Sequence, residues 1–150
     1  MKYNTIIAFP ILILLLVITG CKTMESRKNA ENKPLIGTNW VLKTIEGKLI
    51  PETETKVNIV FNNVGQFNGS TGCNRFFGNF TFSKKSIKID PTGATKKMCR
   101  NMDLEKIFFQ TLNKDMNRYV INKDTLLLLS NKNELFRFIA EDMIEEESMQ

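Results

Sequence analysis

Short segments that alternate apolar and polar residues are the feature that most constrains how this chain can fold. Residues 56–61 place Val57, Ile59 and Phe61 on one face, which is the period of a half-buried strand. Turn residues such as Gly47 and the 62–65 segment separate this stretch from its neighbours. We expect further strands at 39–46, 66–70, 80–83, 86–90, 119–121, 125–130 and 134–139, with 91–93 breaking the pattern.

One segment has helical spacing instead. It begins after Asn101, a candidate N-cap, and is expected to end near Asn113. Its apolar face consists of Leu104, Ile107, Phe108, Thr111 and Leu112. One helix among short strands predicts an α+β fold, a single domain in which a curved antiparallel sheet of short strands packs on one main helix.

Most phenylalanines are expected in the core of this domain. They are Phe61, Phe67, Phe76, Phe77, Phe80, Phe82, Phe108, Phe109, Phe136 and Phe138. An alternative is that Arg75, Phe76 and Phe77 form an exposed binding patch. Asn74 would then contact a ligand, whereas a structural Asn74 would satisfy backbone groups of a loop.

The N-terminus resembles a bacterial lipoprotein signal. The apolar run 11–18 is too short to span a bilayer and fits a signal-peptide core. The sequence Ile18-Thr19-Gly20-Cys21 resembles a lipobox, so we expect lipidation, including palmitate, at Cys21. An ordinary cleaved signal and an uncleaved anchor are the alternatives. Lys22, in place of the Asp that retains many such proteins at the inner membrane, favours the outer membrane.

This interpretation divides the chain into a signal peptide (1–20), a lipidated Cys with a flexible tether (21–34), a folded domain (35–140) and an acidic tail (141–150). The chain carries a net charge of +5, which draws a membrane-held protein toward anionic surfaces; lysines spread over a solvated surface are the alternative. We therefore expect a lipid-anchored monomer of the cell envelope. Its partners would be the membrane and an unknown envelope protein or anionic ligand, but no nucleic acid.

Several kinds of catalytic chemistry lack their usual residues. The chain has no His, which is the commonest general base and metal ligand. It also has no phosphate-binding glycine loop and no pair of cysteines at CxxC spacing. We expect no catalytic residue, no metal site and no cofactor, and hence a protein that is not an enzyme.

Two motifs carry a family resemblance. The first is Gly72-Cys73-Asn74-Arg75-Phe76-Phe77-Gly78-Asn79-Phe80 and the second is Thr95-Lys96-Lys97-Met98-Cys99. Together they resemble the META domain, the family of HslJ-like heat-shock lipoproteins, over about residues 35–140. The matching signature residues are Gly72, Cys73, Asn74, Phe76, Gly78, Thr95, Met98 and Cys99. The resemblance implies an envelope protein linked to stress response and novobiocin tolerance, with no established catalytic activity.

The two cysteines other than Cys21 allow three interpretations. In an oxidising compartment, Cys73 and Cys99 would form a disulfide. They could instead be two reduced, buried side chains. Cys99 could also be a reactive thiol, because nearby Lys96, Lys97 and Arg100 would lower its pKa.

Three functions follow from these observations. The preferred one is a non-catalytic envelope lipoprotein that binds a ligand during stress. The second is an envelope protein-interaction or assembly factor that uses an exposed sheet edge or the basic face. The third is a thiol redox protein that uses Cys73 and Cys99.

Overall fold

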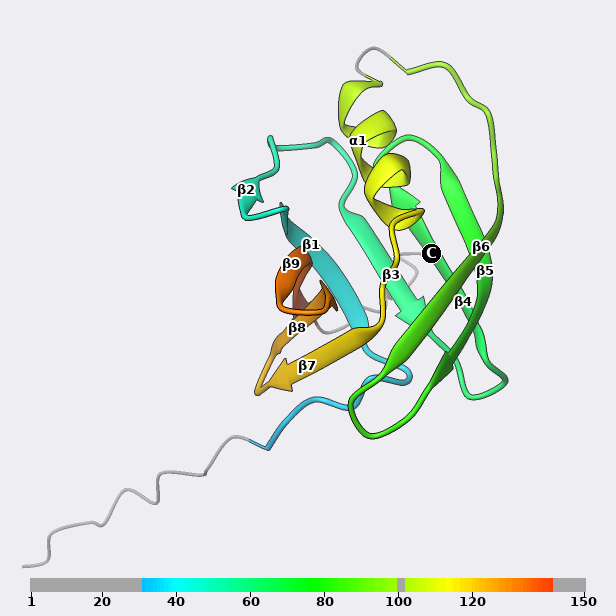
Figure 1. Ribbon diagram of the computed structural model, residues 1–150. Helices are drawn as coiled ribbons and strands as arrows, with labels where there is room; N and C mark the ends of the chain where they lie inside the picture. The colour runs from blue at the N-terminus through cyan, green and yellow to red at the C-terminus, as the bar shows by residue number, and fades with distance from the viewer. Residues whose placement is uncertain (1–30, 100–101, 142–150) are drawn as a thin grey trace, which may run out of the picture.

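The computed structural model describes residues 31–99 and 102–141. The expected signal peptide, Cys21, most of the tether and residues 142–150 lie outside this part. Within it, nine strands form one sheet in the order β6-β5-β4-β3-β1-β9-β8-β7, with β2 paired to β1 (Figure 1). No helix in the described part is long and apolar enough to cross a membrane. The elements are β1 (Asn39–Ile45), β2 (Lys48–Leu49), β3 (Val57–Phe61), β4 (Gln66–Thr71), β5 (Arg75–Phe82), β6 (Ile87–Ala94), α1 (Asp103–Leu112), β7 (Arg118–Asn122), β8 (Thr125–Ser130) and β9 (Asn133–Glu141).

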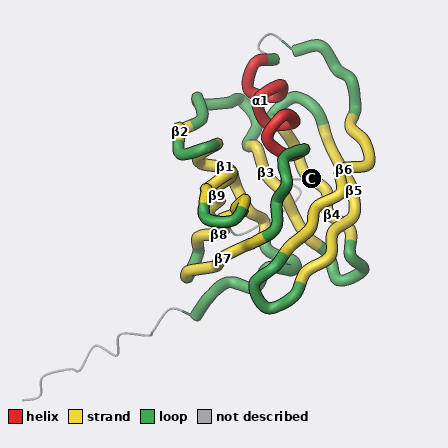
Figure 2. The backbone as a smooth tube through the Cα atoms, in the orientation of Figure 1, coloured by secondary structure: helices red, strands yellow, loops and turns green. Residues whose placement is uncertain are grey.

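The sheet is antiparallel throughout and curls until its two edge strands meet. At the seam, the Ile87 amide donates to the Asn117 carbonyl at 3.4 Å, and the Tyr119 amide donates to the Lys85 carbonyl at 3.2 Å. Figure 2 shows the strands wrapped around a common interior. The seam between the start of β6 and the start of β7 is therefore where the curled sheet closes.

The expected α+β architecture, with the sheet packed on one main helix, is wrong. The fold is β-rich, and α1 has only ten residues and lies at one end of the curled sheet (Figure 1). Trp40, Ile59 and Leu128, all on strands, are fully buried. Because a curled sheet encloses its own inner face, it needs a helix only to cover an open end. Residue periodicity shows which side chains face inward but not how strongly the sheet curves.

Two strands differ from the expected boundaries. β5 begins at Arg75 and so includes most of the first motif, whose glycines had suggested a turn instead of a strand. β6 continues through Pro91 to Ala94 instead of breaking there. An edge strand tolerates proline because one side of its backbone has no ladder partner, and β6 is at an edge of the sheet order.

The helix occupies the expected region. Asn101, the expected cap, lies outside the described residues, and Met102 takes the N-cap position without a side-chain cap bond. The Phe108 ring lies 4.9 Å from the Phe76 ring and 5.2 Å from the Phe136 ring, measured between centroids. Through Phe108, the helix therefore contacts two strands that lie far apart in the sheet order.

Three residues expected on buried faces are exposed. Phe77, Phe82 and Ile107 are 52%, 51% and 49% exposed, respectively. Phe77 points outward because β5 alternates and its neighbours Phe76 and Gly78 face the core. Phe82 ends β5 beside the seam, where the interior opens to solvent, and its ring stacks on that of Phe80.

Glu141, assigned to the acidic tail by the sequence, is the last residue of β9. Its carboxylate forms ion pairs with Lys43 and Lys56. The hydrogen bond from Lys56 lowers the pKa of Glu141, against the opposing effect of burial. The folded domain therefore uses the first acidic residue of that run.

Candidate functional site

Asn74, the central residue of the first motif, is fully buried and joins three parts of the fold. Its Oδ1 accepts hydrogen bonds from the Thr95 hydroxyl and the Lys97 amide, both at 2.7 Å. Its Nδ2 donates to the Lys97 carbonyl at 3.1 Å and to both carboxylate oxygens of Glu105, at 2.9 and 3.0 Å. One side chain thus links the β4–β5 turn to the 95–99 segment, here called the strap, and to α1.

Thr71 completes this polar knot, which we define as Thr71, Asn74, Thr95 and Glu105. The Thr71 hydroxyl donates to the Glu105 carboxylate and accepts a hydrogen bond from the backbone N–H of Asn74 at 3.0 Å. No buried side-chain nitrogen or oxygen in the described part of the chain lacks a partner. Thr71 and Asn74 are buried, Glu105 is half-buried and Thr95 is exposed. Because the Asn74 side chain has partners within the protein at both its oxygen and its nitrogen, it holds these segments together.

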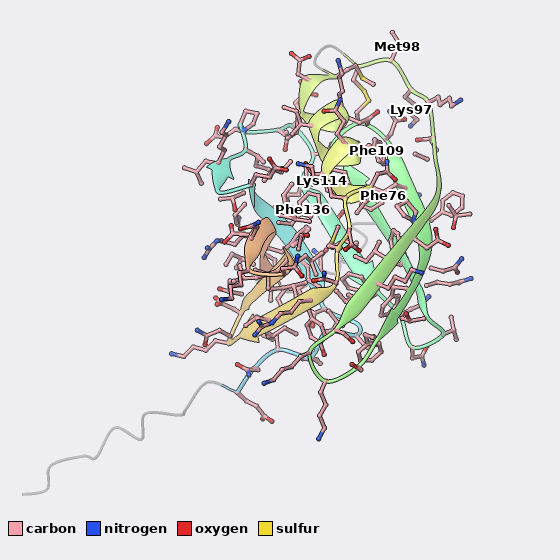
Figure 3. The ribbon with its side chains drawn as sticks, viewed as in Figure 1. Phe76, Lys97, Met98, Phe109, Lys114 and Phe136 are labelled. Carbon is pink, nitrogen blue, oxygen red and sulfur yellow. A yellow bond between two sulfur atoms is a disulfide. The ribbon has the colours of Figure 1, made fainter. Side chains whose placement is uncertain are left out.

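Cys73 and Cys99 form a disulfide across 26 residues, with their Cα atoms 6.1 Å apart. The bond joins the β4–β5 turn to the end of the strap near Met98 (Figure 3). It lies beside the Asn74 network, since the Asn74 Nδ2 is 3.5 Å from the Cys73 Sγ. The two motifs that carry the family resemblance therefore meet in space. Of the three interpretations of these cysteines, the disulfide is the one present in the structure.

The backbone conformation and close packing of the first motif explain why it has glycine at positions 72 and 78. Gly72 has a φ of +89°, which side-chain-bearing residues rarely adopt. A Cβ on Gly78 would lie 2.3 Å from the Asp90 carbonyl oxygen and 2.6 Å from the Phe67 ring. Both positions require glycine for the chain to turn or for neighbouring atoms to approach closely.

Met98 is the exception among the signature residues. Phe76 is buried and Thr95 joins the knot, but the Met98 side chain is 91% exposed and points away from the domain (Figure 3). The alternative in which Arg75, Phe76 and Phe77 form one exposed patch is not what the structure has, because Phe76 faces the core between two exposed neighbours. In the described residues, no group of three or more Cys, Asp and Glu side chains could hold a metal ion.

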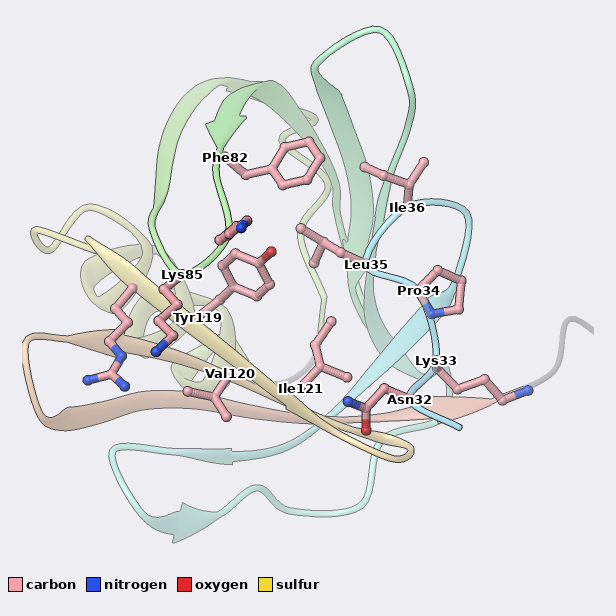
Figure 4. Close-up of a pocket in the computed structure, with 12 residues that line it drawn as sticks. Asn32, Lys33, Pro34, Leu35, Ile36, Phe82, Lys85, Tyr119, Val120 and Ile121 are labelled. Atoms are coloured by element: carbon pink, nitrogen blue, oxygen red, sulfur yellow. The ribbon is translucent and has the colours of Figure 1, made fainter. Parts of the chain in front are cut away.

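A second site lies at the seam of the sheet. We call it the basic groove; it has a volume of about 650 Å³ and is lined by residues 32–36, Phe82, Lys84, Lys85 and residues 118–121. Figure 4 shows Phe82 and Leu35 facing Tyr119 and Ile121 across it. Three segments far apart in the sequence thus form one concave surface.

Backbone contacts fix the walls of the basic groove. The Lys33 amide donates to the Lys123 carbonyl at 2.8 Å, and the Gly37 amide donates to the Phe61 carbonyl at 2.8 Å. The Tyr119 hydroxyl donates to the Ser83 carbonyl at 3.1 Å and connects the two sides of the seam. The groove is consequently a preformed feature, as most ligand pockets are.

All charged side chains that line the basic groove are positive. Its lining contains Lys33, Lys84, Lys85 and Arg118 but no carboxylate. Within residues 31–99 and 102–141, the side chains of Lys84, Lys85 and Arg118 form no ion pair. Since Lys85 and Lys33 lie at opposite ends in Figure 4, cations border an apolar centre.

Sequence reasoning missed this groove. It treated Lys84 and Lys85 as turn residues and 21–34 as a tether, without connecting either to residues 118–121. Only the curl of the sheet brings β7 against the β5–β6 turn. The sequence feature that could have indicated the groove was the Lys84-Lys85 pair close to Phe82 at the end of an expected strand.

Comparisons with known proteins identify the family. Residues 33–143 match the META domain. A protein of Burkholderia xenovorans with an NMR structure is 16% identical with a TM-score of 0.57, covering 71% of this chain and 83% of its own. A second NMR structure is 23% identical with a TM-score of 0.51, covering 68% of this chain and 88% of its own. These two likenesses concern the fold.

The comparison with curated proteins found no match. The family match extends over most of the chain and includes both motifs, the polar knot and the basic groove from Lys33 onward. It confirms the resemblance drawn from the two motifs. This chain belongs to the META domain family.

Proposed function

We propose that this protein is a non-catalytic, lipid-anchored component of the bacterial cell envelope that binds an anionic ligand in the basic groove. The observation that carries this proposal is the group formed by Lys84, Lys85 and Arg118, three cations without an ion-pair partner in the described residues. An anionic ligand would supply the missing counter-charge, and its binding would be favoured by field focusing in a concave site.

The lining also indicates the ligand's chemistry. The Arg118 guanidinium can bind a phosphate or carboxylate in a bidentate manner. Phe82, Tyr119 and Ile121 offer apolar surface between the cations. A volume of about 650 Å³ lies within the range of small-molecule pockets. The best-fitting class is an amphiphile with an anionic headgroup and an alkyl or aryl portion.

A titration of the mature chain with monomeric lysophosphatidylglycerol, followed by NMR, tests this assignment. We expect shifts at the groove backbone, much weaker effects from lysophosphatidylcholine, and weak binding of inorganic phosphate, which lacks the apolar part. Lys84→Glu/Lys85→Glu should weaken binding at least tenfold, since about 1.4 kcal/mol corresponds to a factor of ten and two attractive charges become repulsive.

Lys96→Glu/Lys97→Glu is the matched control. It makes the same change in net charge on the exposed strap. Lys97 lies at the opposite end of the domain from the entering chain, which forms one wall of the groove (Figure 3). This variant should bind within about twofold of the wild type, because charges beyond a Debye length of ~8 Å are largely screened. Equal loss in both variants, or shifts centred on the strap, would contradict a specific groove.

The anchor is tested in cells with Cys21→Ser. We expect this variant to lose palmitate labelling and to leave the outer-membrane fraction, since acyl chains supply the affinity for that membrane. If anchoring serves heat and antibiotic tolerance, as the family resemblance implies, the same strain should survive both stresses less well. Unchanged fractionation would remove the anchor from the proposal, and unchanged survival would remove the stress role.

A redox role is the second candidate, favoured by the exposed position of Cys99. Lys96 and Lys97 precede it in the strap, and cations there would stabilise a thiolate after reduction. Against it, the bond lies beside the fully satisfied Asn74 network. Differential alkylation of the native protein distinguishes the two roles: an inert, bonded pair supports a structural disulfide, and rapid labelling of Cys99 supports redox exchange.

A further inference from the structure

The basic groove lies on a larger basic face. A second hollow of about 610 Å³ adjoins it, lined by residues 83–86, Asn117, Arg118, Asn131 and Lys132. Lys84, Lys85 and Arg118 line both hollows, and neither lining contains a carboxylate. The turn between β5 and β6 therefore projects between two concave surfaces of the same charge.

An aromatic side chain accompanies these cations. Phe82 is 51% exposed and ends β5, directly before the turn that carries the Lys84-Lys85 pair. Aromatic residues favour the boundary between water and the hydrocarbon of a membrane. Lysines beside them can extend to the headgroups while their alkyl stems cover apolar surface. A turn with this composition suits a membrane surface rather than bulk water.

The position of this face relative to the start of the domain is the third observation. Residues 32–36 form one wall of the basic groove, so the chain enters the domain at this face. Figure 1 shows the β5–β6 turn beside the entering chain and α1 at the opposite end. The eleven residues from Cys21 to Glu31 are joined by ten residue-to-residue steps, which span at most about 35 Å when extended.

We propose that this face, formed by Phe82, Lys84, Lys85, Arg118 and Lys132, docks on an anionic phospholipid bilayer. The anchor assigned under the proposed function would hold the face close to the leaflet that carries the lipid, and the inference rests on that function for its ligand class. Each basic residue near an anionic membrane strengthens binding roughly fivefold. Docking would place the groove where single anionic lipids can enter it.

The test uses the mature chain with Cys21→Ser, so that no acyl chain contributes. It is sedimented with vesicles of phosphatidylcholine alone or of equal parts phosphatidylcholine and phosphatidylglycerol. We expect binding to the anionic vesicles only, a loss of at least tenfold in Lys84→Glu/Lys85→Glu, and a change within twofold in Lys96→Glu/Lys97→Glu. Equal binding by the two charge-reversal variants, or no binding to anionic vesicles, would overturn the proposal.

A second measurement reports contact directly. The single tryptophan, Trp40, is fully buried, so brominated lipids should quench a new tryptophan in Phe82→Trp and leave Trp40 unaffected. Quenching in anionic vesicles supports docking through this turn, and its absence despite sedimentation overturns the assignment of the face.

The two proposals can fail separately. If monomeric lysophosphatidylglycerol binds the groove but vesicles do not bind, docking is wrong and the ligand class stands. If vesicles bind through Phe82 while the monomer causes no groove shifts, docking stands and the groove ligand is wrong. Binding of a soluble acidic peptide without vesicle binding would assign the face to a protein partner and overturn docking.

Discussion

Replacing Asn74 with alanine is expected to lower the free energy of unfolding by about 3 kcal/mol, because it removes the hydrogen bonds of a fully buried side chain, including those to the Glu105 carboxylate. The side-chain amide of Asn74 forms hydrogen bonds with the backbone of Lys97, the Thr95 hydroxyl and the Glu105 carboxylate. Truncation would remove all of these bonds and detach the strap from α1. Urea denaturation of oxidised protein measures the effect.

Asn79→Ala is the matched control, since Asn79 is exposed on β5 and should change stability by only about 0.5 kcal/mol or less. Asn74→Asp separates hydrogen bonding from size. Its carboxylate would face Glu105, so destabilisation should be largest near neutral pH and ease as pH falls and one carboxyl binds a proton. An Asn74→Ala cost no larger than that of Asn79→Ala would contradict the role of the polar knot.

Removing the disulfide with Cys73→Ala/Cys99→Ala is expected to cost roughly 3–4 kcal/mol. The bond closes a loop across 26 residues, and the chain-entropy model assigns that amount to a loop of this size. Comparable denaturant midpoints for the variant and the reduced wild type are expected, because both lack the same constraint on the unfolded chain.

The oxidised wild type provides the reference for this series, and Met98→Ala controls for changes within the strap. Met98 is exposed and should not affect stability measurably. If the oxidised and reduced proteins unfolded at the same denaturant concentration, the disulfide would not stabilise the folded state. Redox exchange would then become the better account of the two cysteines.

The strands could be predicted from the sequence more readily than the fold class. Alternation placed Val57, Ile59 and Phe61 on one face, and all three are buried in β3. The same pattern could not show how far the sheet curls. That curl lets β6 meet β7 and reduces α1 to a cover at one end, so the α+β expectation was wrong.

The signature motifs could likewise be predicted from the sequence, whereas the basic groove could not. Motif residues marked the polar knot and the disulfide because those groups are close in sequence to turns that need glycine, asparagine or cysteine. The groove depends on Lys84, Lys85 and Arg118 meeting across a seam. Nothing in the local sequence of either segment specifies that meeting.

The most direct test of the central claim is photo-crosslinking of the full lipoprotein in its envelope with an anionic lipid that carries a photoreactive acyl chain. Mass spectrometry would locate the modified residues. We predict crosslinks in the β5–β6 turn around Phe82 and in β7 around Tyr119 and Ile121, with loss of both in Lys84→Glu/Lys85→Glu. Crosslinks confined to the strap or to the outer face of β1 and β3, unaffected by that variant, would contradict the assignment of the basic groove.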